Sequence, residues 1–121
     1  LESIILSNES LIDDELLEMG IQVWEEGHLV LLDLSNNNLT LIPDDISNLL
    51  TLTNLNLGFN QLEEIPETIA EIPNLIYLGL QSNILSQIPA AIGIMGSLEG
   101  LYLGDNLLST LSILLKIVIS D

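Results

Sequence analysis

Leucines recur along this chain at a fixed interval of 23 residues. They occupy three sets of positions, namely 29, 52, 75 and 98, then 32, 55, 78 and 101, and finally 34, 57, 80 and 103. A period in this range indicates a stacked array, because one unit of this length cannot bury its own apolar face and needs its neighbours to complete the core. The pattern predicts one domain, 1–121, built from five units with boundaries at 1–28, 29–51, 52–74, 75–97 and 98–121.

Each unit combines two kinds of apolar spacing. A leucine pair separated by one residue alternates with period two, which is typical of a short strand with one buried face. A proline follows at positions 43, 66 and 89, and the apolar residues around it, such as Ile42, Ile46 and Leu49, change to helical spacing. Proline is tolerated where a helix begins, because the N–H that it lacks would have no partner there. We expect a strand on one side of every unit and a short helical or 3-10 turn on the other.

The first unit is longer and is expected to contain a true helix. Its four leucine positions are filled by Leu1, Ile4, Leu6 and Leu11, and Glu9 stands where the later units have asparagine. The segment 13–27 carries apolar residues at helical spacing, with acids on the other face. These apolar residues are Leu16, Leu17, Ile21 and Trp24.

One asparagine follows the strand in each of the four later units, at Asn37, Asn60, Asn83 and Asn106. The backbone turns there inside the stack, which leaves N–H and C=O groups without a strand or helix partner. A side-chain amide offers two donors and an acceptor, so stacked asparagines can satisfy those groups. The alternative, a ligand-binding role, is disfavoured because the spacing equals the repeat period. We expect a buried, structural asparagine ladder that ends or frays at Glu9.

The complete pattern, L-x-x-L-x-L-x-x-N-x-L-x-x-I-P-x-x-I-x-x-L over residues 29 to about 111, resembles the leucine-rich repeat family. It is most similar to the IP-containing repeats of Ras-group and bacterial proteins, and the 28-residue first unit resembles the ribonuclease-inhibitor class. The expected fold is an α/β solenoid. It forms a shallow right-handed arc with a concave parallel sheet of about five strands and short helical or 3-10 turns on the convex side.

Polar and aromatic residues between the strand leucines point to the concave face, where open repeat arrays commonly bind partners. Both tyrosines of the chain are among them, and exposed aromatics beside amides and acids are typical of a protein-binding patch. The alternative is that the tyrosines merely decorate the strands. The candidate residues are Leu31, Asp33, Ser35, Asn54, Asn56, Tyr77, Gly79, Gln81, Gly100, Tyr102 and Asp105.

Charge excludes one class of partner. The chain has 18 acids, a single base, Lys116, and no arginine, which gives a net charge of −17. Such a chain repels phosphate backbones and anionic lipids, so nucleic acid is not an expected partner. Many acids fall on the segments between strands and predict a negative convex side, either a solvated surface or a docking surface for a basic protein. They are Asp13, Asp14, Glu15, Glu18, Glu25, Glu26, Asp44, Asp45, Glu63, Glu64, Glu67 and Glu71.

The sequence contains no constellation typical of an enzyme, and we expect no cofactor or metal. There is no cysteine, and His28 has no nucleophile visibly paired to it. The acids at 13–15 lack the alternating ligand spacing of a calcium loop. No apolar run reaches the roughly eighteen residues of a membrane span.

These observations favour a protein-protein interaction module, the recognition part of a longer effector or signalling protein. Two alternatives stay open: a regulator or scaffold of a small-GTPase complex, suggested by the resemblance to Ras-group repeats, and an extracellular adhesion repeat. The glycosylation sequons at Asn8 and Asn38 permit the adhesion role. The absence of cysteine favours the cytoplasm, with secretion or an extracellular location as alternatives.

The ends of the chain have no polar terminal unit of the kind that repeat arrays need. The last unit has Ser112 in place of the proline and continues with Leu114, Leu115 and Val118 at core spacing. We expect either that the chain is a segment of a longer protein or that it self-associates through this C-terminal unit.

Overall fold

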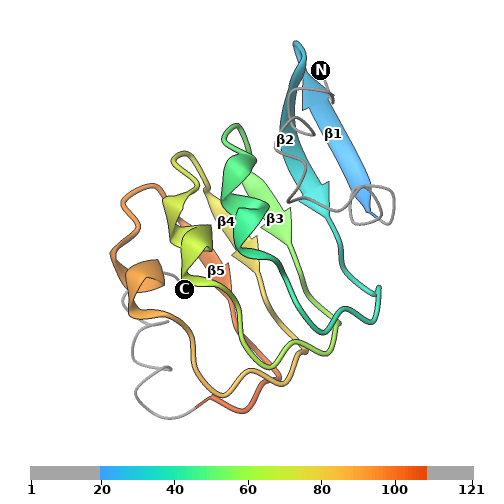
Figure 1. Cartoon of the computed structure of the whole chain (residues 1–121), viewed down its shortest axis with the longest axis vertical. Helices are drawn as coiled ribbons and strands as arrows, with labels where there is room; N and C mark the ends of the chain where they lie inside the picture. Colours follow the sequence, from blue (N-terminus) through green and yellow to red (C-terminus); the bar gives the residue numbers. More distant parts are fainter. Residues whose placement is uncertain (1–19, 109–121) are drawn as a thin grey trace.

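A computed structural model of the chain describes residues 20–108. Five strands form one sheet in the order in which they occur along the chain (Figure 1). They are β1 (Ile21–Glu25), β2 (His28–Asp33), β3 (Asn54–Asn56), β4 (Tyr77–Gly79) and β5 (Gly100–Tyr102). Three 3-10 helices connect the later strands, namely η1 (Asp44–Asn48), η2 (Glu67–Glu71) and η3 (Ala90–Ile94). The helices lie together on one side of the sheet (Figure 1).

Strands β2 to β5 are parallel, and their register reproduces the sequence period. Leu32 pairs with Leu55, Leu55 with Leu78, and Leu78 with Leu101, so every partner lies 23 residues further along the chain. Equivalent positions of successive coils therefore lie side by side. The leucine-rich repeat solenoid predicted from the spacing is confirmed for this part of the chain.

The core fills the space between the sheet and the 3-10 helices. The strand leucines and the isoleucines on the returning segments form one buried cluster, in which Leu34, Leu57 and Leu80 are fully buried. Each 3-10 helix contributes one buried isoleucine, Ile46, Ile69 or Ile92. Fully burying a side chain of this size stabilises the fold by roughly 1.5–3 kcal/mol.

The prolines precede the 3-10 helices and set the backbone angle at which each begins. Pro43, Pro66 and Pro89 are the N-cap residues, with φ values of −71°, −72° and −60°. These values lie within the range that the proline ring enforces. The backbone N–H of Ile46 donates to Pro43 O at 3.1 Å, which is the i to i+3 bond of a 3-10 turn.

The predicted helix over 13–27 is wrong for Ile21–Glu25. These residues form β1, which pairs antiparallel with β2. The turn between the two strands is Glu26–Gly27, with φ values of 52° and 85°, and positive φ at both central residues is typical of a tight hairpin turn. The sheet is therefore not entirely parallel, and Glu25 and Glu26 belong to a hairpin instead of a helical outer segment.

The hairpin directs alternate side chains to opposite faces of the sheet. Gln22 and Trp24 are partly buried on the core side, where the Trp24 indole N–H donates to Gln22 Oε1 at 2.9 Å. Trp24 also packs against the buried cluster. The predicted strand near residues 4–6, Glu9, the acids at 13–18 and the proposed self-association residues at 114–118 lie outside the described residues.

Candidate protein-binding face

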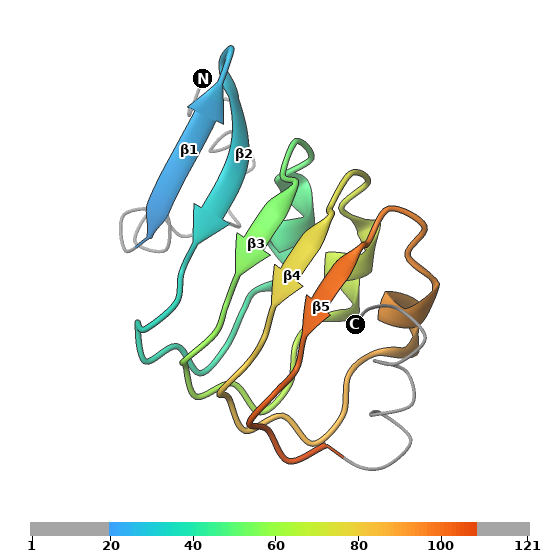
Figure 2. The same ribbon diagram turned by 180° about the vertical axis from the view of Figure 1, so that it is seen from behind.

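The side of the sheet opposite the 3-10 helices is uncovered by other elements of residues 20–108 (Figure 2). We call it the open face; it corresponds to the predicted concave face. Strand register arranges its residues in two rows that cross β2 to β5. The first row is Leu31, Asn54, Tyr77 and Gly100, and the second is Asp33, Asn56, Gly79 and Tyr102.

A hollow of about 800 Å³ lies on the open face. Eight of the eleven candidate residues line it, namely Leu31, Asp33, Asn54, Asn56, Tyr77, Gly79, Gln81 and Tyr102. Ser35 and Gly100 do not line the hollow. Asp105 does not line it. Asp105 is exposed in the turn after β5, where one carboxylate oxygen accepts a hydrogen bond from the Ser82 hydroxyl at 3.1 Å.

Each tyrosine lies opposite a glycine of the neighbouring strand. Tyr77 pairs with Gly100, and Gly79 pairs with Tyr102. A Cβ atom placed on Gly100 would lie 2.6 Å from Tyr77 Cδ1 and 3.3 Å from Tyr102 Oη, so both tyrosines approach the same glycine. The missing side chain therefore leaves the space that the Tyr77 ring occupies. The two rings remain half exposed, at 41% for Tyr77 and 50% for Tyr102.

Side-chain amides occupy the middle of the hollow. Asn56 Oδ1 accepts from the backbone N–H of Gly58 at 2.9 Å, which fixes that amide. The Gln81 side chain lies against Gly58, where an added Cβ would approach Gln81 Nε2 to 2.6 Å. Gln81 Oε1 is buried and has no hydrogen-bond partner among residues 20–108. An unpaired buried acceptor of this kind is costly, and a donor that reaches it recovers that cost.

The hairpin adds two residues to the open face that sequence reasoning missed. Ile21 pairs with Asp33 and Val23 with Leu31, so both side chains share the face of their partners. Ile21 is 67% exposed and Val23 41%. They were missed because the apolar spacing was interpreted as a helix. The alternation of apolar and polar residues across 21–23, followed by Gly27 ahead of a second apolar run, was the available signal for a hairpin.

Three of the four ladder asparagines, Asn60, Asn83 and Asn106, link their coil to the one before it. Asn60 Nδ2 donates to Leu57 O in its own coil at 2.9 Å and to Leu34 O in the preceding coil at 3.2 Å. Asn83 and Asn106 repeat this pair of contacts one and two coils further on. Asn60 and Asn83 are buried, whereas Asn37 and Asn106, at the two ends of the series, are partly exposed.

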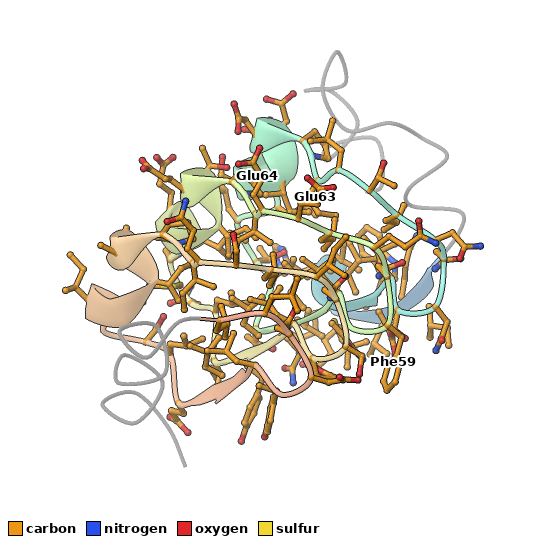
Figure 3. The ribbon with its side chains drawn as sticks, turned by 90° about the horizontal axis from the view of Figure 1, so that it is seen from below. Phe59, Glu63 and Glu64 are labelled. Atoms are coloured by element: carbon orange, nitrogen blue, oxygen red, sulfur yellow. The ribbon has the colours of Figure 1, made fainter. Side chains whose placement is uncertain are left out.

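The residue before each ladder asparagine adopts a left-handed conformation. Its φ is 60° at Asn36, 56° at Phe59, 57° at Ser82 and 59° at Asp105. Asparagine and aspartate tolerate this region, but a bulky residue there is strained. Phe59 is also 52% exposed. Figure 3 shows Phe59 at the edge of the molecule, far from Glu63 and Glu64.

The described part of the chain is strongly negative, because residues 20–108 contain eleven acids and no lysine or arginine. Four of these acids lie on η1 and η2, on the side of the sheet opposite the open face, which we call the outer side. They are Asp44, Asp45, Glu67 and Glu71. Within the described segment, no group of three or more His, Cys, Asp or Glu side chains is placed to hold a metal ion. The helices found between residues 20 and 108 are also too short or too polar to cross a membrane.

Comparison with known proteins identifies relatives of this fold. The family model described as leucine rich repeat matches residues 27–85. A solved leucine-rich-repeat protein of Leptospira interrogans is similar to the chain, with 38% sequence identity and a TM-score of 0.61. The match covers 63% of this chain, which spans only 19% of that protein. No curated protein matches the sequence.

Proposed function

Because this chain belongs to the leucine-rich repeat family, we propose that it binds a partner protein through the open face, with Tyr77 and Tyr102 as the central anchors. Domains of this family generally mediate protein-protein interaction. The open face is the surface we assign to that role, because it combines a hollow, two half-exposed aromatic rings and unburied amides.

The observation that carries this proposal is the approach of both tyrosines to Gly100. A ring that already lies on a strand loses little conformational freedom when a partner covers it, and tyrosine is enriched among residues that dominate binding energy. Two such rings on adjacent strands form a preformed apolar contact with hydroxyl groups at its rim. This arrangement suits recognition of another protein.

The composition of the hollow favours binding over catalysis. The lining residues include one carboxylate, Asp33, and no histidine, cysteine, serine or lysine. Asp33 Oδ1 is engaged by the backbone N–H and the hydroxyl of Ser35, at 2.9 and 2.6 Å. Nucleophilic catalysis needs a nucleophile within reach of a base, and this set of side chains does not supply that pair.

The proposed partner is a basic protein. Eleven acids without a lysine or arginine between residues 20 and 108 create a negative field around the open face. Such a field accelerates association with a positively charged surface and repels an acidic one. A small-GTPase complex, the alternative drawn from the family resemblance, would appear as a GTPase among the captured proteins in the experiment below.

Affinity capture with the whole chain tests the proposal. Tyr77→Ala combined with Tyr102→Ala should reduce the amount of specifically captured protein at least tenfold without unfolding the chain. Ile94→Ala is the matched control, because Ile94 is an apolar residue on η3 that is 84% exposed on the opposite side. Equal capture by the wild type and the tyrosine variant would show that the contact lies elsewhere.

A further inference from the structure

The open face carries different chemistry at its two ends. At the β1 end, Ile21, Val23 and Leu31 form an aliphatic surface, because the pairing of β1 with β2 places them on one face. At the β5 end, Tyr77 and Tyr102 present aromatic rings. This difference arises from the hairpin and is absent from the periodic part of the sequence.

Amides separate the two ends. Asn54 and Asn56 on β3 and Gln81 after β4 line the hollow between the aliphatic surface and the tyrosines. A side-chain amide both donates and accepts, as the peptide groups of an extended chain do. The buried Gln81 Oε1, which has no partner among the described residues, adds an unsatisfied acceptor to this region. The middle of the face is thus suited to main chain.

Charge identifies the group that suits the tyrosine end. Glu99 immediately precedes β5 and Asp105 follows it by three residues, and both carboxylates are exposed. A guanidinium group binds the face of an aromatic ring through cation-π attraction, and the negative charge of the described residues favours a cation at this end of the face. The described residues offer no cation of the Lys or Arg type that would compete for this place.

We propose that the open face binds an extended segment of a partner protein that crosses the strands. One aliphatic side chain of the segment covers Ile21, Val23 and Leu31, and an arginine lies against Tyr77 and Tyr102. This inference rests on the proposed function and adds the chemistry of the partner. The anchors are three to four strand spacings apart, roughly 14–19 Å, which an extended chain spans in about four to six residues.

Selection from a library of random dodecapeptides displayed on phage, with the full chain as bait, tests this proposal. Selected peptides should carry a Leu, Ile or Val and an Arg separated by about four to six residues. Two bait variants locate the anchors. Ile21→Thr combined with Val23→Thr keeps β-branched residues but removes the aliphatic contact, and Tyr77→Ala combined with Tyr102→Ala removes the rings.

Binding of a synthetic selected peptide then measures each contact. Replacing its arginine with glutamine should weaken binding by roughly 5- to 30-fold with the wild-type protein, the range expected for a cation-π contact. The same replacement should have almost no effect with the tyrosine variant, because the contact is already lost. Ile94→Ser serves as the control for an unrelated apolar substitution on the outer side.

The outcomes separate this inference from the proposed function. Peptides that require the tyrosines but lack the paired aliphatic and arginine residues would overturn the two-ended occupant and leave the function in place. Binding that neither double variant reduces would overturn both. Failure to enrich any peptide would show that an extended segment is not the occupant, and the capture experiment would still decide whether the face binds a folded protein.

Discussion

Replacing Asn60 with alanine should lower the free energy of unfolding by about 3 kcal/mol. The Asn60 side-chain oxygen accepts hydrogen bonds from two backbone N–H groups of the preceding coil, those of Asn37 at 3.0 Å and Leu39 at 2.9 Å. The alanine side chain has no hydrogen-bond acceptor. The variant therefore removes the side-chain oxygen to which these two N–H groups donate inside the stack.

The three carbonyl groups that accept from Asn60 lose less. Leu34 O also accepts from the Asn37 side chain at 3.1 Å, and Leu57 O also accepts from the Asn83 side chain at 3.0 Å. The third, Gly58 O, also accepts from a backbone N–H at 3.2 Å. The penalty therefore comes chiefly from the two stranded donors.

Burial decides how much each donor contributes. Leu39 is buried, so its unpaired N–H should carry the full penalty of roughly 1–3 kcal/mol. Asn37 is partly exposed, so water can replace part of its lost bond. The sum is about 3 kcal/mol, a large fraction of the 5–15 kcal/mol that typically stabilises a folded domain.

The same reasoning predicts an order among the ladder variants. The Asn83 oxygen accepts from the buried Leu62 N–H at 3.0 Å, so Asn83→Ala should cost about 2 kcal/mol. Asn37 contributes donors, to Leu34 O and Ser35 O, within the described residues. Asn37→Ala should therefore cost less than about 1 kcal/mol.

Urea unfolding of the full chain measures this order. Far-ultraviolet circular dichroism follows the whole array, and the fluorescence of the single tryptophan, Trp24, follows the hairpin. Gln61→Ala is the control, because Gln61 lies next to Asn60 but is exposed, and its change should stay within about 0.5 kcal/mol. Equal losses for the three ladder variants, or a loss at Asn60 no larger than at Gln61, would refute the accounting of stranded donors.

Three further substitutions test local features by the same unfolding assay. Gly100→Ala should destabilise by about 1–2 kcal/mol, because its Cβ overlaps the Tyr77 ring, and no loss relative to Gly96→Ala, whose Cβ meets nothing within 4 Å, would contradict that packing. Phe59→Asn should stabilise by about 1 kcal/mol by relieving a left-handed backbone, and unchanged stability would argue against strain. Gly27→Ala should cost about 1 kcal/mol and shift the tryptophan emission, since φ is 85° there, and an unaltered spectrum would count against the hairpin turn.

The repeated part of the fold could be predicted because the sequence period of 23 residues is also the separation between paired residues on neighbouring strands. Once Leu32, Leu55 and Leu78 are recognised as equivalent, parallel pairing in that register is the arrangement that buries all three on one face. The prolines then fix where each returning segment begins. Neighbouring coils solve the same packing problem with the same residues, so the inference from one coil extends to the others.

The hairpin could not be predicted in this way, because it occurs once. Leu17, Ile21 and Trp24 fit helical spacing, whereas Ile21 and Val23 fit strand alternation, so periodicity alone does not choose between them. Pairing with β2 settles the choice, since an antiparallel partner satisfies the backbone groups of β1 and lets Trp24 contact the core. The strand conformation of 21–25 thus depends on tertiary contacts, which the local sequence pattern predicts only in part.

The composition of the hollow was predictable, but its shape was not. Strand alternation places Tyr77 and Tyr102 on the open face. That both approach Gly100 depends on the direction in which each side chain leans and on the glycine opposite. The sequence shows glycine at positions 79 and 100. Only the cross-strand register, which places each of them opposite a tyrosine, explains why glycine is there.

Under the proposed function, the positions that differ from coil to coil are the ones that give this array its specificity. The leucine, isoleucine and asparagine positions repeat because every coil must fill the same core and satisfy the same turn. The two open-face rows do not repeat, since one changes from Leu31 to Asn54, Tyr77 and Gly100 as it crosses the sheet. The core and the turn place no common demand on these positions, so each coil can carry a different residue there. In the proposed complex, the partner distinguishes the aliphatic end of the face from its aromatic end, and that asymmetry would give binding a single direction along the array.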